Sequence, residues 1–392
     1  VGLLVLEAGA LLVPGLSALH ALAAILVGTL VGNLLLSLAG VAGADHGLPT
    51  RVLLRPVLGQ RGSFLPSALN LIQLIGWTAF EFWAISLAAS RVSETLFGFS
   101  GYGLWLVVFA VVCTLLALGG PLVVVRQWLE KFGVWLVYGA TLWMTIALFT
   151  QYDVLALLRQ PGTGELPFWL AVDLAVAMPV SWLPLVADFT RFAKKPRAAF
   201  RGTYLGYLVA NVWFYALGAL FMLVLQLSAP TPENLATAIV GLTGSVIALL
   251  VILVNEVDNA FADIYSASVT VQNILPRVSQ RWLIVGIGAV SLLLAAFLTM
   301  GQYFSFLLLI GSVFAPLFGI LAADYYVLRR RRLQADQLYK PGGVYWYQAG
   351  INWLAVVAWA AGVAVYHLIA NALPDLGATL PGFAASFLLY LA

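Results

Sequence analysis

Five acidic side chains stand inside apolar stretches of the sequence. They are Glu7, Glu81, Glu256, Asp258 and Asp263. A carboxylate near the centre of a bilayer costs about 2.5–3.5 kcal/mol or more, so such groups are retained where they face a water-filled cavity and bind something. The five residues therefore predict a site for a solute, an ion, or both within a membrane.

Three of these acids lie on one segment, Asn255 to Ser266. At about 100° per residue, Glu256, Asn259 and Asp263 share one polar face of a helix. Asp258 lies about 140° away from Asp263, so the helix offers two acidic faces, which suit two neighbouring sites. A helix end projecting into water is the alternative, and the apolar residues on both sides argue against it.

Trp77 and Glu81 are four residues apart and share a face of another predicted helix. An aromatic plate beside a hydrogen-bonding carboxylate suits a flat heterocycle, which stacks on the ring and makes polar contact at its edge. A tryptophan on a membrane helix is by itself more often a packing or interfacial residue. The adjacent Glu81 favours the binding interpretation.

Two predicted spans contain helix breakers. One runs from Glu7 to Pro14 and Gly15, and in the other Pro179 and Pro184 flank Ser181 and Trp182. Each proline removes a backbone donor, which predicts an unwound stretch, with a simple kink as the alternative. The broken spans are the first and the sixth, and interrupted helices in matching positions of two halves indicate an inverted repeat.

The composition identifies the class of protein that holds these residues. Hydrophobic residues make up 62% of the 392 residues and charged residues only 9%, against about 25% charged in soluble proteins. This excludes a soluble enzyme, a disordered protein and a nucleic-acid binder, and it predicts an integral membrane protein. The single cysteine and three scattered histidines indicate neither a disulfide nor a metal cluster, and we expect no cofactor.

About twelve transmembrane helices are predicted, at about 20 residues per span. They cover residues 1–14, 19–44, 64–90, 103–119, 131–150, 167–190, 203–227, 245–273, 282–299, 302–323, 349–370 and 376–391. We expect one transporter domain with a first repeat at 1–150, a second at 167–323 and two extra helices at 349–392. Because Val1 stands in mid-apolar sequence, we expect the N-terminal part of the first helix to be missing.

The basic residues predict the orientation. With the N-terminus in the cytoplasm, every Lys and Arg except Arg91 and Arg159 falls in an inside loop, as the positive-inside rule requires. The predicted location is a cell membrane, crossed many times. Asp188 with Arg191, and Asp324 before the arginine run 329–332, are interpreted as anchors or gate ion pairs at the cytoplasmic side.

Several motifs resemble those of the nucleobase:cation symporter-1 family, which has the LeuT-type fold of two inverted five-helix repeats. The similar stretches are Gly47-Leu48-Pro49 through Arg55, Gly59, Arg61-Gly62, Gly76-Trp77, Ala187-Asp188-Phe189-Thr190-Arg191-Phe192, Gly202-Thr203, Gly206-Tyr207 and Asp263-Ile264-Tyr265-Ser266-Ala267. The resemblance covers nearly the whole chain and looks greatest to the hydroxymethylpyrimidine permease branch, whose substrate is a thiamine precursor.

The resemblance implies a substrate site. Trp77 falls at the stacking aromatic of the third helix, and Glu81 at the position of an edge-reading amide. Ser181 and Trp182 fall in the break of the sixth helix, and Asp263 where relatives often carry a substrate-binding asparagine. Two residues of the first helix join the expected site. They are Gly2 and Glu7, the latter with bridging to another helix as an equal alternative.

The resemblance also implies a cation site. The family's sodium-binding hydroxyls fall at about Asp258 and Asn259, and backbone carbonyls would come from Val1, Gly2 and residues before them. This chain therefore replaces hydroxyls with an acid and an amide. A carboxylate at this position would bind Na⁺ more strongly or would itself carry a proton, so the coupling ion stays open between Na⁺ and H⁺.

The predicted function is cation-coupled import of a pyrimidine-like heterocycle by alternating access. Acids at Glu81 and Asp263 favour an aminopyrimidine, with hydroxymethylpyrimidine first, because ring N–H and amino groups donate to carboxylates. A cytosine, purine or other nucleobase permease is the alternative, and a membrane-embedded enzyme or a channel is more remote. The expected partners are this small molecule and the lipid bilayer, with no nucleic acid, and one chain suffices for transport.

Overall fold

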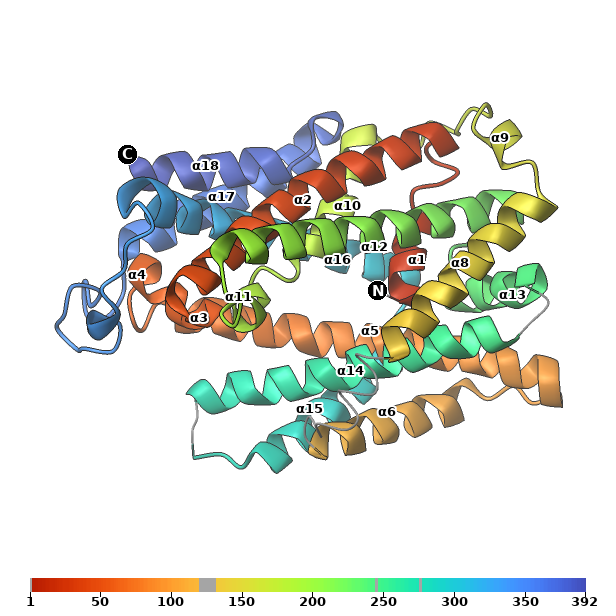
Figure 1. Ribbon diagram of the computed structural model, residues 1–392, viewed down its shortest axis with the longest axis horizontal. Helices are drawn as coiled ribbons and strands as arrows, with labels where there is room; N and C mark the ends of the chain where they lie inside the picture. Colours follow the sequence, from red (N-terminus) through yellow and green to blue (C-terminus); the bar gives the residue numbers. More distant parts are fainter. Residues whose placement is uncertain (1, 120–131, 244–245, 275–276) are drawn as a thin grey trace. The chain divides into compact units, whose positions relative to one another are not determined.

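The computed structural model describes residues 2–119, 132–243, 246–274 and 277–392, and the regular elements within these ranges are all helical (Figure 1). Every predicted span contains a helix. The long apolar helices are α2 (Ala18–His46), α5 (Phe64–Phe97), α8 (Val134–Gln151), α12 (Pro196–Val224), α16 (Met300–Ala322) and α17 (Trp353–Ala372). Helix α14 (Val246–Ile274) is also long but more polar. Shorter helices complete the predicted spans: α1 (Leu3–Ala10), α6 (Tyr102–Leu118), α10 (Phe168–Val180), α11 (Val186–Thr190), α15 (Gln280–Ala295) and α18 (Thr379–Leu391).

Several helices lie outside the predicted spans. They are α3 (Thr50–Leu53), α4 (Arg55–Leu58), α9 (Val154–Leu157), α13 (Pro232–Thr243), the π-helix η2 (Ala323–Leu328), and the 3₁₀ turns η3 (Ala335–Gln337) and η4 (Pro374–Leu376). The longest of them, α13, begins with Pro232 and Glu233 and packs against α1, α8 and α14. It is too short and too polar to register as a span, although it buries an apolar stripe.

The chain forms two compact units, each assembled from segments far apart in sequence. The first comprises Val1–Leu22, Leu71–Glu165 and Trp213–Phe304, and the second comprises Ala23–Asn70, Leu166–Val212 and Ser305–Ala392. Both units contain residues of both predicted repeats. The repeat boundaries themselves stay a prediction.

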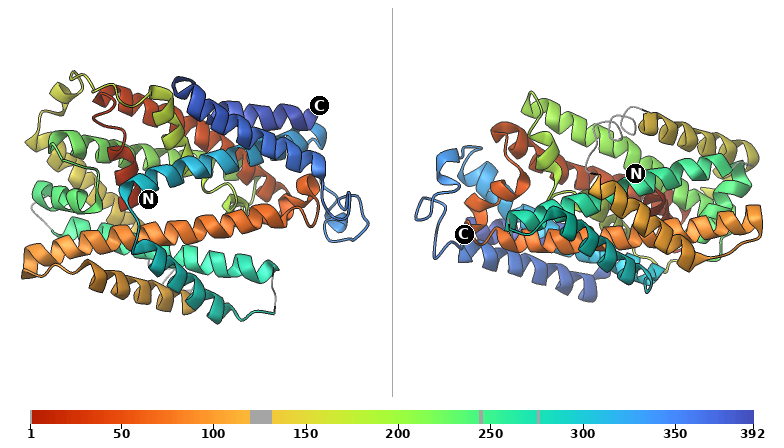
Figure 2. Two further views of the ribbon diagram at one scale, coloured as in Figure 1. Left: turned by 180° about the vertical axis from the view of Figure 1, so that it is seen from behind. Right: turned by 90° about the horizontal axis from the view of Figure 1, so that it is seen from below.

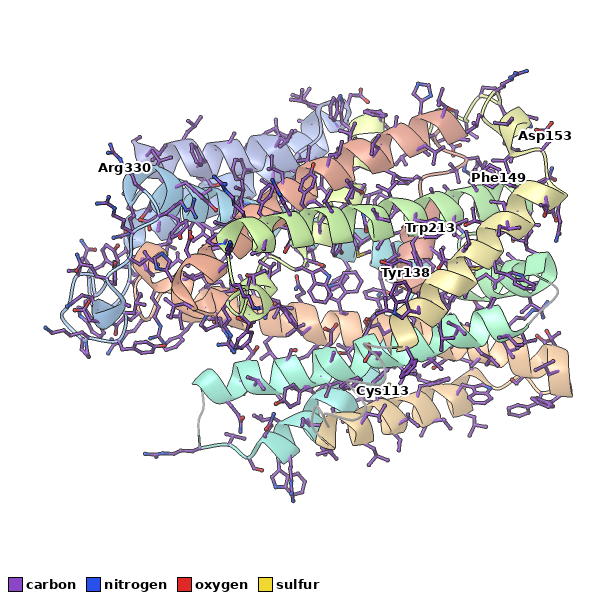
Figure 3. All side chains as sticks on the ribbon, viewed as in Figure 1. Cys113, Tyr138, Phe149, Asp153, Trp213 and Arg330 are labelled. Atoms are coloured by element: carbon purple, nitrogen blue, oxygen red, sulfur yellow. The ribbon has the colours of Figure 1, made fainter. Side chains whose placement is uncertain are left out.

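In the first unit, α6, α14 and α15 pack against one another and lie side by side in the views (Figures 1 and 2). Cys113 of α6 is buried, with its Sγ 3.9 Å from the carbonyl oxygen of Val257 on α14. On the other side of α14, the ring of Tyr138 on α8 stacks on Trp213 of α12 at 6.1 Å between centroids (Figure 3). The indole of Trp213 also donates to the hydroxyl of Thr145, 2.9 Å away. The last two contacts join α8 to α12, and α14 itself packs against α6, α8 and α15.

The break in the sixth span is present and lies in the second unit. Helix α10 ends at Val180 and α11 begins at Val186. Between them the chain makes tight turns, with the N–H of Trp182 bonded to Pro179 O (3.1 Å) and that of Leu183 to Val180 O (3.0 Å). Because Pro184 has no N–H, the regular helical ladder cannot continue through this stretch.

The predicted anchors of the second unit make structural contacts. The N–H of Thr50 at the start of α3 donates to Asp188 Oδ1 (3.0 Å), while the hydroxyl of Thr190 donates to the carbonyl of Gly40 (2.8 Å). Asp324 in η2 forms an ion pair with Arg329 at 2.6 Å. The residues that carry much of the family resemblance therefore hold α11 against α2 and α3.

A second ion pair closes the end of α2. Arg331 approaches Asp45 at 2.6 Å, and the hydroxyl of Tyr325 donates to the same carboxylate, also at 2.6 Å. The hydrogen bond to Asp45 raises the pKa of the Arg331 guanidinium, so Arg331 stays charged across the physiological pH range. The contact ties the segment after η2 to α2.

The last two helices, α17 and α18, pack closely along their lengths in the second unit (Figure 2). The first turn of α18 is capped from α10: Asp173 accepts the N–H groups of Ala378 (2.6 Å) and Thr379 (3.0 Å). A carboxylate at this position satisfies donors that a helix N-terminus leaves without partners. Asp173 is a buried acid that the sequence did not single out, and its contacts are those of a structural cap.

Candidate functional site

The predicted aromatic plate is buried in the first unit. Trp77 on α5 is 8% exposed, and its ring meets Tyr303 of α16 edge-on, 6.2 Å between centroids. Phe80 packs against the same tyrosine at 5.2 Å. The hydroxyl of Tyr303 donates to the carbonyl of Leu4 at 2.8 Å, so this tyrosine connects α16, α5 and α1. Nothing in the sequence around Tyr303 marks it, because a tyrosine at a span end is ordinary.

Glu81 lies one helical turn beyond Trp77 and is also buried. Its Oε2 has no hydrogen-bond partner among the described residues. Glu81 is close enough to Asp263, Glu256 and Asp258 on α14 for their negative charges to act on it. The structure therefore brings the aromatic plate and the predicted edge-reading acids of α5 and α14 into one region.

Glu256 on α14 contacts the N-terminal end of α1. Its Oε1 accepts the N–H of Leu4 at 3.1 Å, and its Oε2 accepts the side-chain amide of Asn259 at 3.4 Å. A Cβ added to Gly2 would collide with Oε1 of this carboxylate. Glu256 thus serves α1 as an acceptor at its N-terminus, where the helix dipole favours negative charge.

The two predicted cation ligands of α14, Asp258 and Asn259, have different surroundings. Asn259 lies beside Glu256, as described, whereas Asp258 and Asn255 line a crevice of about 290 Å³ between α8 and α14. Apart from these two polar residues the crevice is lined by Gly133 and aliphatic side chains. Sequence reasoning placed Glu256 on the polar face but gave it no separate role, because its contact with α1 is a tertiary one.

The remaining predicted site residues divide between the two units and the undescribed positions. Glu7 lies on α1 in the first unit and is completely buried. The carbonyl of Gly2 accepts the N–H groups of Val5 (3.1 Å) and Leu6 (3.3 Å) and so closes the first turn of α1. Val1, predicted as a cation ligand, lies outside the described residues, as do Arg126 and Lys131 of the predicted inside loops.

Ser181 and Trp182 lie in the second unit, on the turns between α10 and α11. The Ser181 hydroxyl donates to the carbonyl of Met178 at 2.7 Å. The Trp182 ring is 38% exposed and tilted against Phe189, 6.4 Å between centroids. The structure therefore places these two residues at the helix break, and it places Trp77, Glu81 and Asp263 together in the first unit.

A helical membrane protein with a broken sixth span and a cluster of buried acids belongs to the class of secondary transporters. Comparison with known families specifies which kind. Residues 1–390 match the family described as permease for cytosine/purines, uracil, thiamine and allantoin, and the chain belongs to this family.

Individual relatives are similar along most of their length. A hydantoin permease of Microbacterium maritypicum is 27% identical over 392 residues, covering 94% of this chain and 78% of the relative. An allantoin permease of Bacillus subtilis strain 168 is 26% identical, covering 98% and 85%. The cytosine permease of Escherichia coli K12 is 25% identical, covering 93% and 82%. These relatives are permeases, and this chain is a transporter, not an enzyme.

Solved structures show the same fold. The nucleobase-cation-symport-1 family transporter Mhp1, in a closed conformation with bromovinylhydantoin bound, superposes with a TM-score of 0.83 at 24% identity, covering all of this chain and 88% of Mhp1. A Na⁺-coupled sialic acid symporter superposes with a TM-score of 0.61 at 14% identity. The predicted all-helical LeuT-type transporter fold is confirmed.

Proposed function

We propose that this transporter imports a pyrimidine-like heterocycle by cation-coupled alternating access, with hydroxymethylpyrimidine as the substrate that we favour. One observation carries the proposal: a buried aromatic plate and two acids, Glu81 and Asp263, gather in the first unit. A planar ring stacks on Trp77 while its edge meets the two carboxylates. The permease family supports the transport reaction, and the acids support the choice of ring.

The acids favour a ring that donates hydrogen bonds. An aminopyrimidine presents an exocyclic amine and, once protonated, a ring N–H, and both pair with a carboxylate in charge-assisted bonds. The negative charge of Asp263 acts on Glu81, and the two acids repel each other when both are ionised. A protonated ring relieves that repulsion. A ring rich in carbonyl oxygens instead places hydrogen-bond acceptors next to carboxylate oxygens, which are also acceptors. Cytosine shares the amino group and is the nearest alternative.

Hydantoin-like rings are a second candidate because of the comparisons. One relative is a hydantoin permease, and the Mhp1 structure contains bromovinylhydantoin. A hydantoin has ring N–H groups for the carboxylates but no amine, and its two carbonyls need donors. Both classes of ring can donate to Glu81 and Asp263, but only the hydantoin carbonyls need donors that ionised carboxylates do not supply.

The proposed coupling ion is Na⁺ or H⁺, bound between the N-terminal end of α1 and the middle of α14. Asp258 and Asn259 are the proposed ligands or proton carriers, and Gly2 and Val1 would contribute backbone carbonyls. The contact of Glu256 with the N–H of Leu4 supports coupling between this end of α1 and α14. A carboxylate in place of a hydroxyl leaves both cations chemically reasonable.

Uptake into proteoliposomes tests the proposal. Hydroxymethylpyrimidine, cytosine, uracil and hydantoin are compared with and without Na⁺, at a mildly acidic and a mildly alkaline pH. We expect the aminopyrimidines to accumulate against a gradient and to depend on one of the two cations. Preferential uptake of uracil or hydantoin would contradict the choice of ring, and insensitivity to both cations would contradict coupling.

The variant Glu81→Gln sharpens this test. It removes the charge but keeps the shape, so hydroxymethylpyrimidine affinity should fall about tenfold or more, since a hydrogen bond to a charged group is worth about 1.5–3 kcal/mol. Hydantoin should be affected much less. The control Glu94→Gln removes an exposed acid that pairs with Arg91 at 2.6 Å and should change neither affinity.

A further inference from the structure

Glu7 is a buried acid that lacks hydrogen-bond donors. Its exposed fraction is 0%, and neither Oε1 nor Oε2 has a partner among the described residues. Every residue of α1 around it is buried as well. An ionised carboxylate under these conditions is strongly disfavoured, because no hydrogen-bond donor replaces the water that it loses.

The helices packed against α1 supply further acids. The charged groups that act on Glu7 are Glu256 of α14 and Glu233 of α13, both negative when ionised. Tyr303 of α16 directs its hydroxyl to the carbonyl of Leu4, and Tyr215 of α12 presents its backbone carbonyl to α1 at Gly9. The acids of α13 and α14 therefore oppose a negative charge on Glu7, and neither tyrosine contact supplies it with a donor.

Glu256 differs from Glu7 although the two are close. The N–H of Leu4 and the amide of Asn259 donate to its two oxygens, at 3.1 and 3.4 Å. Donors stabilise a carboxylate, so Glu256 is suited to hold the negative charge of the pair and Glu7 to stay neutral. Two neighbouring acids in unlike environments divide the acid and base roles in this way.

We propose that Glu7 is a reversible proton-binding site built into α1, and that the proton it holds is the one coupled to transport. The O–H bond of Glu7 forms with a proton from water on one side of the membrane and breaks to return the proton to water on the other. This inference rests on the proposed cation-coupled function and specifies the ion as H⁺. It makes Glu7 the carrier of the coupled proton, in place of Asp258 and Asn259.

Infrared spectroscopy of the reconstituted protein tests proton binding without any substrate. The wild type should show the carbonyl band of a protonated carboxylic acid, shifted in D₂O, and Glu7→Gln should remove one component of it. Glu94→Gln, at an exposed acid, should leave the band unchanged. If Glu7→Gln also leaves the band unchanged, Glu7 is ionised and the proposal is overturned.

Transport measurements test coupling. A pH-sensitive dye inside proteoliposomes reports protons entering per heterocycle taken up, with hydroxymethylpyrimidine, cytosine and hydantoin as probes. The ratio should fall toward zero in Glu7→Gln, stay near the wild-type value in Glu94→Gln, and be rescued by Glu7→Asp. An unchanged ratio in Glu7→Gln, or a wild type that moves no protons, overturns the coupling role. If none of the probes is transported, the proposed function fails, while the infrared result still decides whether Glu7 binds a proton.

Discussion

The surroundings of Trp77 distinguish it from other tryptophans of the chain. Many tryptophans of membrane helices face lipid or an interface, and Trp135 on α8 is 74% exposed in this chain. Trp77 instead is buried, meets Tyr303 edge-on and precedes a buried carboxylate by one turn. Burial beside an acid is the feature that distinguishes Trp77 from an exposed tryptophan such as Trp135.

Replacement of Trp77 by alanine should weaken heterocycle binding substantially. Stacking of a base on an aromatic side chain is worth about 1–3 kcal/mol, so the affinity for hydroxymethylpyrimidine should fall by about 5- to 150-fold, with a smaller loss in Trp77→Phe. Equilibrium binding to the purified protein measures this, alongside the thermal unfolding midpoint as a check on folding. The matched control Trp135→Ala should bind normally. Unchanged binding in Trp77→Ala would remove this residue from the site.

Buried acids in this protein serve two different purposes. Asp173 caps α18, and Asp324 pairs with Arg329, so each has structural partners that account for its burial. Glu7 has none among the described residues, and one oxygen of Glu81 likewise has none. The hydrogen-bond partners, not the residue type, therefore distinguish an acid that holds the fold from one available to a ligand or a proton.

Among the helices, α1 depends on a close approach to α12. A Cβ at Gly9 would collide with the carbonyl oxygen of Tyr215, and a Cβ at Gly218 would collide with that of Leu6. Each glycine thus admits the backbone of the other helix, the small-residue contact common between membrane helices. Because backbone cannot move aside as a side chain does, α1 has little freedom to shift along α12.

A single added methyl group at this contact should destabilise the protein. Gly9→Ala and Gly218→Ala should each lower the free energy of unfolding by about 1–3 kcal/mol, the usual cost of overpacking. Thermal unfolding in detergent provides the measurement. Gly139→Ala on α8 is the matched control, since nothing lies within 4 Å of its added Cβ, and it should be neutral or slightly stabilising. Equal effects at all three positions would show that helix propensity, not the contact, governs the result.

At the scale of the whole molecule, the distribution of basic residues predicts how the protein sits in the membrane. The residues after η2 are rich in arginine, whereas the loop around α9 carries only Arg159. The positive-inside rule therefore places Arg330 in the cytoplasm and Gln160 outside. Both residues are exposed, and the only native cysteine, Cys113, is buried, so the native background for thiol labelling is low.

Cysteine labelling in intact cells should reveal this orientation. A membrane-impermeant maleimide should label Gln160→Cys in intact cells and Arg330→Cys only after permeabilisation. The unmodified chain is the control and should stay unlabelled in both conditions. The reverse pattern would place the N-terminus outside and would require the span assignment to be revised.

The sequence alone determined the class of protein, the positions of the spans and the break in the sixth one. These properties follow from local quantities: apolar runs long enough to cross a bilayer, and prolines that end the helical ladder between Val180 and Val186. The amphipathic helix α13 was not predicted because it is too short and too polar to form a span, and its packing against α1, α8 and α14 is a tertiary property.

Only the tertiary structure decided which polar groups meet. It paired Glu256 with the N–H of Leu4, 252 residues away in the chain, and it left Glu7 without hydrogen-bond donors among the described residues. It also brought Tyr303 against Trp77. Hydrogen bonds and ring contacts depend on distances between helices, and a helical period reports the face on which a residue lies, not what that face touches.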